Sequence, residues 1–286
     1  MTKNILGIIA SPRKLGNCEI FIKEISRHFE FEHTLHLIRL SDFNIKPCKG
    51  CYGCLSGAKK CRLKDDLDII ITAMKAADAI IVAAPTYFLG PNGTLKMLLD
   101  RGLCFYAHSD QLWHKPAIGI GIAGIKGKEG YTLLGIDNFL KSILAHVKHR
   151  CMVYGALPGE VFLNQNNRQT AKKLALTLFK VPIPPGTPFC PLCYGDTFQF
   201  LGNNRIRCML CSNSGTFFIQ NDQVTIKINS DGHDFNLNAE KANEHRLWLE
   251  NMQERFLKEK SKLKKIVLTY RKEGLWIKPN QLEKNR

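Results

Sequence analysis

Short apolar runs alternate with amphipathic stretches from residue 3 to about residue 180. Continuous apolar runs are typical of strands buried on both faces of a parallel sheet, and helical periodicity is typical of the helices that cover it. The predicted strands are residues 4–10, 34–40, 79–84, 117–123 and 151–156. The predicted helices are residues 17–29, 65–76, 93–103, 131–147 and 167–179. Strict alternation of these elements predicts an α/β fold with a parallel sheet.

Five strands and five helices in this order fit a flavodoxin-like doubly wound sheet. Such sheets hold their ligand outside the carboxyl ends of the strands, beside the point where the strand order reverses. Binding residues are therefore expected in the loops that follow the strands.

The second half of the chain has a different organisation. Four prolines within residues 181–188 exclude a helix interior and predict a stiff linker at 182–188. We therefore expect a flavodoxin-like domain over residues 1–181, with a cysteine loop inserted at 46–62. A small domain over residues 189–230 and a basic helical tail over 231–286 should follow.

The chain of 286 residues carries 41 Lys and Arg against 25 Asp and Glu, which gives a formal charge of +16. This charge suits nucleic acid, acidic proteins or anionic cofactors and does not choose among them. Residues 255–272 hold eight basic residues and the single acid Glu259, beside an apolar stripe that includes Leu249, Met252, Phe256 and Leu263. We interpret the basic face as the solvated side of a docked helix, with nucleic-acid binding as the alternative.

No run approaches the roughly 18 apolar residues of a membrane span, and the amino terminus lacks the pattern of a secretory signal. Both observations predict a cytoplasmic protein that does not bind a membrane. Disulfides seldom persist in that compartment, so the eleven cysteines favour metal binding. Eight of them form two compact sets, and Cys18, Cys104 and Cys151 are single, the last two expected to be small buried residues.

The first set comprises Cys48, Cys51, Cys54 and Cys61. Its tight C-x2-C-x2-C spacing favours a 4Fe-4S cluster, and the interleaved glycines let the backbone wrap around a bulky centre. A structural zinc site with four thiolates is the alternative. The many basic residues of this loop would stabilise the reduced cluster and raise its potential.

The second set comprises Cys190, Cys193, Cys208 and Cys211. Two C-x2-C knuckles separated by fourteen residues are typical of a zinc ribbon, in which residues 197–201 and 206–207 would form a hairpin. We predict structural zinc, and a rubredoxin-type iron is the alternative.

The loop after the first strand has the composition of a phosphate site. Ser11, Arg13, Gly16, Asn17 and Cys18 lead into a helix whose first N–H groups and dipole suit a phosphate. An ordinary turn capped by a polar residue would look the same on loop chemistry alone.

Two motifs carry a resemblance to a known family. Ser11-Pro12-Arg13 with Gly16-Asn17 resembles the opening motif of the NAD(P)H-dependent FMN reductases, although Cys18 stands where those proteins usually have Ser or Thr. The run Pro85, Thr86, Tyr87, Phe88, Leu89 and Gly90 resembles the loop of that family whose backbone and aromatic residue contact the isoalloxazine ring. Gly124, in a third glycine-rich loop, could approach the other side of the flavin.

Together with the first cysteine set, these motifs resemble the iron-sulfur flavoproteins of anaerobic microbes over about the first 180 residues. The resemblance implies a homo-oligomeric oxidoreductase that moves electrons between FMN, a 4Fe-4S cluster and a partner such as ferredoxin, NAD(P)H or a quinone. No side chain is expected to act as a catalytic acid or base. The alternatives are an NAD(P)H-dependent FMN or quinone reductase and a nucleic-acid-binding redox sensor.

Overall fold

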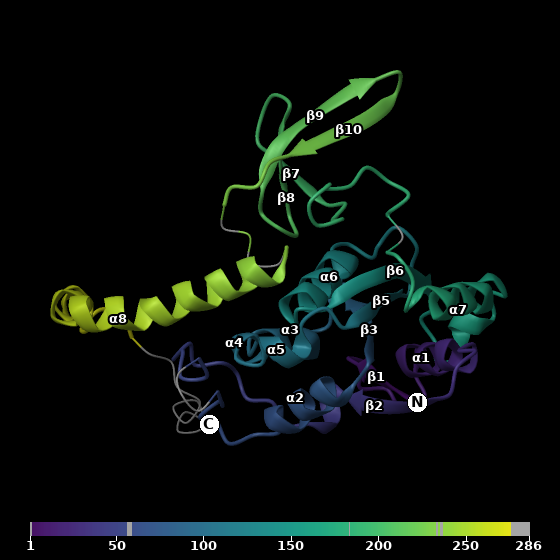
Figure 1. Ribbon diagram of the computed structural model, residues 1–286, viewed down its shortest axis with the longest axis horizontal. Helices are drawn as coiled ribbons and strands as arrows, with labels where there is room; N and C mark the ends of the chain where they lie inside the picture. Colours follow the sequence, from purple (N-terminus) through teal and green to yellow (C-terminus); the bar gives the residue numbers. More distant parts are fainter. Residues whose placement is uncertain (1, 56–58, 183, 233, 235–236, 276–286) are drawn as a thin grey trace.

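The computed structural model describes residues 2–55, 59–182, 184–232, 234 and 237–275 (Figure 1). Five parallel strands lie in the order β2-β1-β3-β5-β6, and the short β4 pairs antiparallel with β3. This is the flavodoxin-like order, so the predicted fold class is confirmed. The strands are β1 (Lys3–Ile9), β2 (His33–Arg39), β3 (Ala79–Tyr87), β4 (Gly90–Pro91), β5 (Pro116–Ala123) and β6 (His146–Tyr154).

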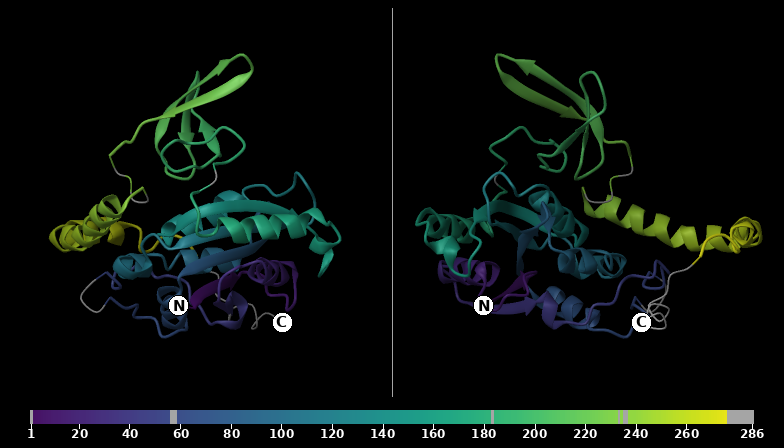
Figure 2. Two further views of the ribbon diagram at one scale, coloured as in Figure 1. Left: turned by 45° about the vertical axis from the view of Figure 1, so that its right-hand side comes forward. Right: turned by 180° about the vertical axis from the view of Figure 1, so that it is seen from behind.

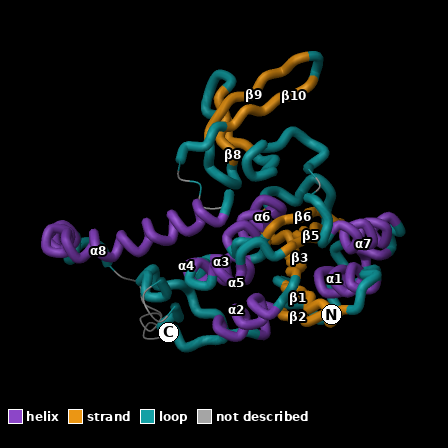
Figure 3. Tube along the Cα trace, in the orientation of Figure 1, coloured by secondary structure: helices purple, strands orange, loops and turns teal. Residues whose placement is uncertain are grey.

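Helices cover both faces of this sheet (Figures 1 and 3). Alternate residues of a strand face opposite sides, so Leu6 and Ile8 of β1 enter one apolar core whereas Ile5 and Ile9 enter the other. The second core is covered by α1 (Asn17–Arg27) and α7 (Asn166–Thr177). The first core is covered by α2 (Leu67–Ala76), α3 (Gly93–Leu99), α4 (Leu103–Tyr106), α5 (Ser109–Leu112) and α6 (Thr132–Ser142). Short 3-10 turns lie at η1 (Leu40–Asp42) and η2 (Glu160–Phe162).

The predicted helix 131–147 was too long. Helix α6 ends at Ser142, where Leu144 adopts a left-handed conformation with φ 64°. The N–H of Ala145 donates to the carbonyl of Leu140 at 3.0 Å, which closes the helix in the manner of a Schellman motif. Glycine usually occupies the position of Leu144, so the sequence carries no stop signal there. The fifth strand consequently begins at His146, five residues before its predicted start.

A second, antiparallel sheet follows in the order β10-β9-β8-β7 (Figure 2). Its strands are β7 (Phe198–Phe200), β8 (Arg205–Cys208), β9 (Ser214–Gln220) and β10 (Gln223–Ile228). The second cysteine set and Ile206 form its small core, against which Leu134 of α6 packs. Arg150 of β6 also pairs with Asp196 at 3.1 Å, which ties the small sheet to the large one.

The chain then forms α8 (Ala239–Thr269), a helix of 31 residues that extends away from the body (Figures 1 and 2). Its first half docks, since Ala242 and Leu249 are buried in the same core as α4. The prediction of a docked apolar stripe is wrong for the second half, because Phe256 and Ile266 are each about half exposed. Among the described residues, no helix has the length and apolar character needed to cross a membrane.

Candidate functional site

The predicted phosphate loop joins the carboxyl end of β1 to the first turn of α1. Gly16 is the N-cap of α1, and Leu15 turns the chain with φ 52°. Ser11 is buried, and its hydroxyl oxygen accepts the N–H of Arg13 at 3.3 Å. The Arg13 side chain is exposed and donates to the Ala156 carbonyl, 3.0 Å away, in the loop after β6. The loop thus places a hydroxyl, a guanidinium and a helix amino terminus together, which is a donor set that fits a phosphate.

Asn17 and Cys18 are present in this loop, but their side chains serve the scaffold. The Asn17 amide donates to the carbonyls of Gly155 and Leu157 and accepts the N–H of Gly159, at 2.9–3.0 Å. Cys18 is 1% exposed, and burial raises the pKa of its thiol to about 12. Both residues can therefore offer a phosphate only their backbone N–H groups.

The predicted isoalloxazine loop forms a tight hairpin between β3 and β4. Phe88 and Leu89 occupy its two turn positions, both with positive φ (48° and 66°), where Asn-Gly is the usual pair. The side chains at the tip are exposed, with Phe88 fully so. Two bulky residues in a left-handed turn are costly, and such conformations cluster at ligand sites.

The loop after β5 holds this hairpin in place through residues that the motif analysis missed. The Tyr131 N–H donates to the Leu89 carbonyl at 2.7 Å, and the hydroxyls of Thr86 and Thr132 are 2.8 Å apart. Gly90 is required here, since a Cβ atom on it would lie 2.3 Å from the Tyr131 ring. A glycine such as Gly90 indicates a position where another group can approach the backbone closely. Nothing in the sequence marks Tyr131 as the residue that does so.

Further contacts join the loops to one another. Asn92, which follows β4, donates from its side chain to the Ala10 carbonyl at 2.7 Å and so links the hairpin to the phosphate loop. Gly124 packs against Ala156, whose carbonyl accepts the hydrogen bond from Arg13. A Cβ atom added to Gly124 would lie 3.3 Å from the Ala156 side chain. The predicted flavin residues of three loops therefore meet at one edge of the sheet.

The first cysteine loop leaves the sheet after β2 and is closed at its base by a buried ion pair. The side chains of Arg101 and Asp65 are each 1% exposed, with Nη1 and Oδ2 2.5 Å apart. Arg101 also donates to the Lys46 carbonyl at 2.7 Å, and Asp65 accepts the Lys46 N–H at 2.9 Å. This pair holds the two ends of the loop together.

The four thiols of this loop differ in exposure. Cys54 is buried in the first core and Cys61 packs against it, whereas Cys48 and Cys51 are exposed. Cys104 of α4 is buried as predicted and interacts with Cys54. Burial alone would lower the pKa of Arg101, but the hydrogen bonds of its guanidinium with the Asp65 carboxylate and then with the Cys61 sulfur raise it.

Hydrogen bonds to sulfur accompany this arrangement. The N–H of Gly50 donates to Cys48 Sγ at 3.4 Å, and the N–H of Leu63 donates to Cys61 Sγ at 3.5 Å. Donors of this kind stabilise metal-bound thiolates. The donor set fits a metal cluster, although these four sulfurs do not form one of the compact metal-sized groups found among the described residues. A multi-iron centre separates its thiolates more widely than a single ion does.

The second cysteine set does converge. The four sulfurs all lie within 4.8 Å of one another. Cys190 and Cys211 Sγ are 3.8 Å apart, and Cys193 and Cys208 Sγ are 3.5 Å apart. A tetrahedral ion with metal–sulfur bonds of about 2.3 Å separates its sulfurs by about 3.8 Å. The geometry therefore fits one tetrahedral ion.

The two knuckles share one backbone form. Tyr194 and Ser212, the residues that follow each C-x2-C, have left-handed φ values of 65° and 63°. The next N–H groups, those of Gly195 and Asn213, donate to Cys193 and Cys211. The repeated turn explains why the spacing in the sequence identified this site.

Comparison with known proteins agrees with this geometry. The model of the NADPH-dependent FMN reductase family matches residues 3–149. The chain belongs to this family. It is accordingly a flavin-dependent oxidoreductase. The match ends before the second cysteine set and α8, so membership of the family says nothing about the role of either.

Several relatives are named iron-sulfur flavoprotein. One, from Methanocaldococcus jannaschii, is 40% identical over 138 residues, which cover 47% of this chain and 70% of that protein. Another, from Methanosarcina thermophila, is 34% identical over 140 residues, covering 48% of this chain and 72% of the relative. A solved flavone reductase superposes with a TM-score of 0.67 over 96% of this chain and 100% of its own, at 15% identity. That likeness shows the fold, and it extends over both sheets.

Proposed function

We propose that this protein is an iron-sulfur flavoprotein that moves electrons between FMN, a 4Fe-4S cluster and an external donor or acceptor such as ferredoxin. The observation that supports the proposal is the meeting of the three predicted flavin loops at the same sheet edge from which the cysteine loop departs. Bound there, FMN would exchange electrons in pairs and the cluster would exchange them singly.

The chain's own residues would divide the binding work. Ser11, Arg13 and the amino terminus of α1 would hold the FMN phosphate, and the hairpin from Pro85 to Gly90 would receive the ring. The exposed rings of Tyr87 and Phe88 are available to cover an aromatic face. Gly124 would allow the backbone of the third loop to approach closely.

Cys48, Cys51, Cys54 and Cys61 would hold the cluster. Arg101 is the buried cation beside them, and it would stabilise the more negative, reduced cluster. One of the loop lysines, Lys60, pairs with Asp68 at the surface, 2.7 Å away, so its own influence on the cluster would be weaker. Cys190, Cys193, Cys208 and Cys211 would hold zinc as a closed structural site.

Anaerobic reconstitution with iron, sulfide and FMN tests the proposal. We expect a flavin spectrum with an added broad iron-sulfur absorption, and loss of the latter alone in a Cys54→Ser variant. A protein that binds FMN but retains no sulfide would leave the flavin assignment standing and reject the cluster.

NAD(P)H as the direct electron donor is a second candidate, favoured by the family description. Rapid anaerobic mixing with NADPH should then bleach the flavin. Flavin that stays oxidised with NADPH, but is reduced by a reduced ferredoxin, would favour the first candidate.

A further inference from the structure

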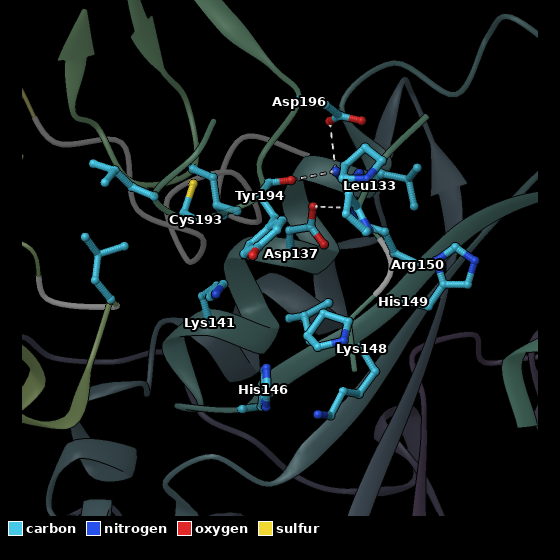
Figure 4. Close-up of a pocket in the computed structure, with 18 of the residues that line it drawn as sticks. Leu133, Asp137, Lys141, His146, Lys148, His149, Arg150, Cys193, Tyr194 and Asp196 are labelled. Carbon is cyan, nitrogen blue, oxygen red and sulfur yellow. Dashed lines mark hydrogen bonds and ion pairs between the residues drawn. The ribbon is translucent and has the colours of Figure 1, made fainter. Parts of the chain in front are cut away.

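A cavity of about 570 Å³ lies between the edge of the large sheet and the small cysteine-bearing sheet (Figure 4). It is lined by β6, α6, the proline-rich segment and the first knuckle. His146 and Lys148 lie at the start of β6, so the cavity lies toward the amino-terminal end of that strand. The predicted flavin loops instead follow the carboxyl ends of β1, β3 and β5. The cavity is therefore separate from the proposed flavin and cluster sites.

Its wall is unusually basic. The basic side chains that line it are Lys141, His146, Lys148, His149, Arg150, Lys173 and His114. Two carboxylates, Asp137 and Asp196, also line the cavity, and both pair with Arg150 at 2.8 and 3.1 Å. Lys141, Lys148, Lys173 and Arg150 outnumber these two carboxylates, and among the described residues none of the three lysines forms an ion pair. Lys141 acts on Asp137 only through its charge.

Lys148 is the most informative of these residues. It is 9% exposed, and among the described residues its side chain forms neither an ion pair nor a hydrogen bond. It is also the extra residue of a β-bulge, since Ala117 pairs with Val147 and Ile118 pairs with His149. Bulges redirect side chains and are frequent beside functional sites.

A buried cation without a partner costs free energy, which an anion in the cavity would offset. Burial lowers the pKa of Lys148, and burial together with Lys148, His114 and Lys141 lowers the pKa of His146 to about 4. Lysines on an edge strand commonly prevent that strand from pairing with other chains, and lysines in this role are exposed to solvent. Lys148 instead lies beneath the proline-rich segment and the small sheet.

Figure 4 shows Lys141, His146 and Lys148 together in one part of the cavity, with Arg150 and its carboxylates in another. The rest of the lining is mostly apolar and includes leucines, prolines and Trp113. The combination of a cationic corner with apolar walls matches an organic anion better than a bare inorganic ion.

We propose that this cavity is a second ligand site, which binds a small organic anion bearing phosphate or carboxylate groups through Lys141, Lys148 and His146. The ligand would bridge the two sheets, because the cavity draws its walls from both. The inference does not depend on the identity of the redox cofactors.

Isothermal titration calorimetry of the full chain with citrate and with glucose 6-phosphate tests this proposal and distinguishes carboxylate from phosphate recognition. We expect one of them to bind with one-to-one stoichiometry. Removing one charge-assisted contact, in Lys148→Met or Lys141→Met, should weaken binding at least tenfold. Lys172→Met removes the same charge from an exposed position outside the cavity and should bind normally.

Lys141 is only partly buried, so its variant decides the question even if Lys148→Met folds poorly. Binding of neither anion to the wild-type chain, or unchanged affinity in Lys141→Met, would overturn the proposal.

Discussion

The buried ion pair at the base of the first cysteine loop provides a quantitative prediction. Replacing Arg101 by Met would leave the Asp65 carboxylate, in a side chain 1% exposed, without its cation. It would also remove the donor to the Lys46 carbonyl. Breaking a buried pair in this way costs about 3–5 kcal/mol. The cost falls on the loop ends, so the equilibrium constant for the loop conformation that presents the four thiols should fall by roughly two to four orders of magnitude.

The assay is anaerobic reconstitution followed by iron, sulfide and FMN analysis. Arg101→Met should retain little iron or sulfide in the first site. FMN binding should persist, because the described partners of the Arg101 side chain are Lys46, Asp65 and Cys61, none of which lies in the predicted flavin loops. The double variant Arg101→Met/Asp65→Asn removes the unpaired charge and keeps an amide oxygen for the Lys46 N–H, so it should recover part of the cluster. Lys64→Met removes an exposed charge just beyond the cysteine loop, next to Asp65, and should assemble normally. Wild-type iron and sulfide in Arg101→Met would refute the reasoning.

Three further predictions follow from other contacts. Asn17→Ala deletes three hydrogen bonds between α1 and residues 155–159 and should weaken FMN binding about tenfold, as measured by flavin fluorescence titration. Unchanged affinity would argue against this loop as the phosphate site. Cys190→Ser should lose the ion of the second site and expose the small sheet to protease, with FMN content unchanged; retention of zinc would contradict the ligand set. His146 has a folded pKa of about 4, below its ordinary value, so it contributes stability that is present above pH 6.5 and is lost as the pH falls toward 4. In denaturant titrations between about pH 7 and pH 4.5, the wild type should therefore lose more unfolding free energy than His146→Gln, and equal losses would exclude this residue as a cause.

The sequence predicted the parallel sheet because its inner strands are continuous apolar runs, and such runs have few alternative structures. It misplaced the boundary between α6 and β6 because a leucine, rather than a glycine, adopts the left-handed turn at position 144. Strand β6 is also an edge strand whose lysine and histidines interrupt the apolar pattern.

For the candidate site as well, local patterns could be predicted from the sequence and long-range contacts could not. Cysteine spacing predicted both sets because metal geometry constrains neighbours along the chain, and the four sulfurs of the second set converge in the structure. Arg101 and Asp65 are 36 residues apart, and only the packing of α3 and α4 against the loop brings them together. Likewise, nothing local marks Asn17 as a scaffold residue, since its three partners lie about 140 residues away.

The central claim is that one chain holds FMN, an iron-sulfur cluster and a separate structural ion. Anaerobic purification followed by metal, sulfide and flavin analysis tests it most directly. The account predicts about one FMN, four irons, four sulfides and one zinc per chain. Zinc in both cysteine sets with no sulfide would contradict it.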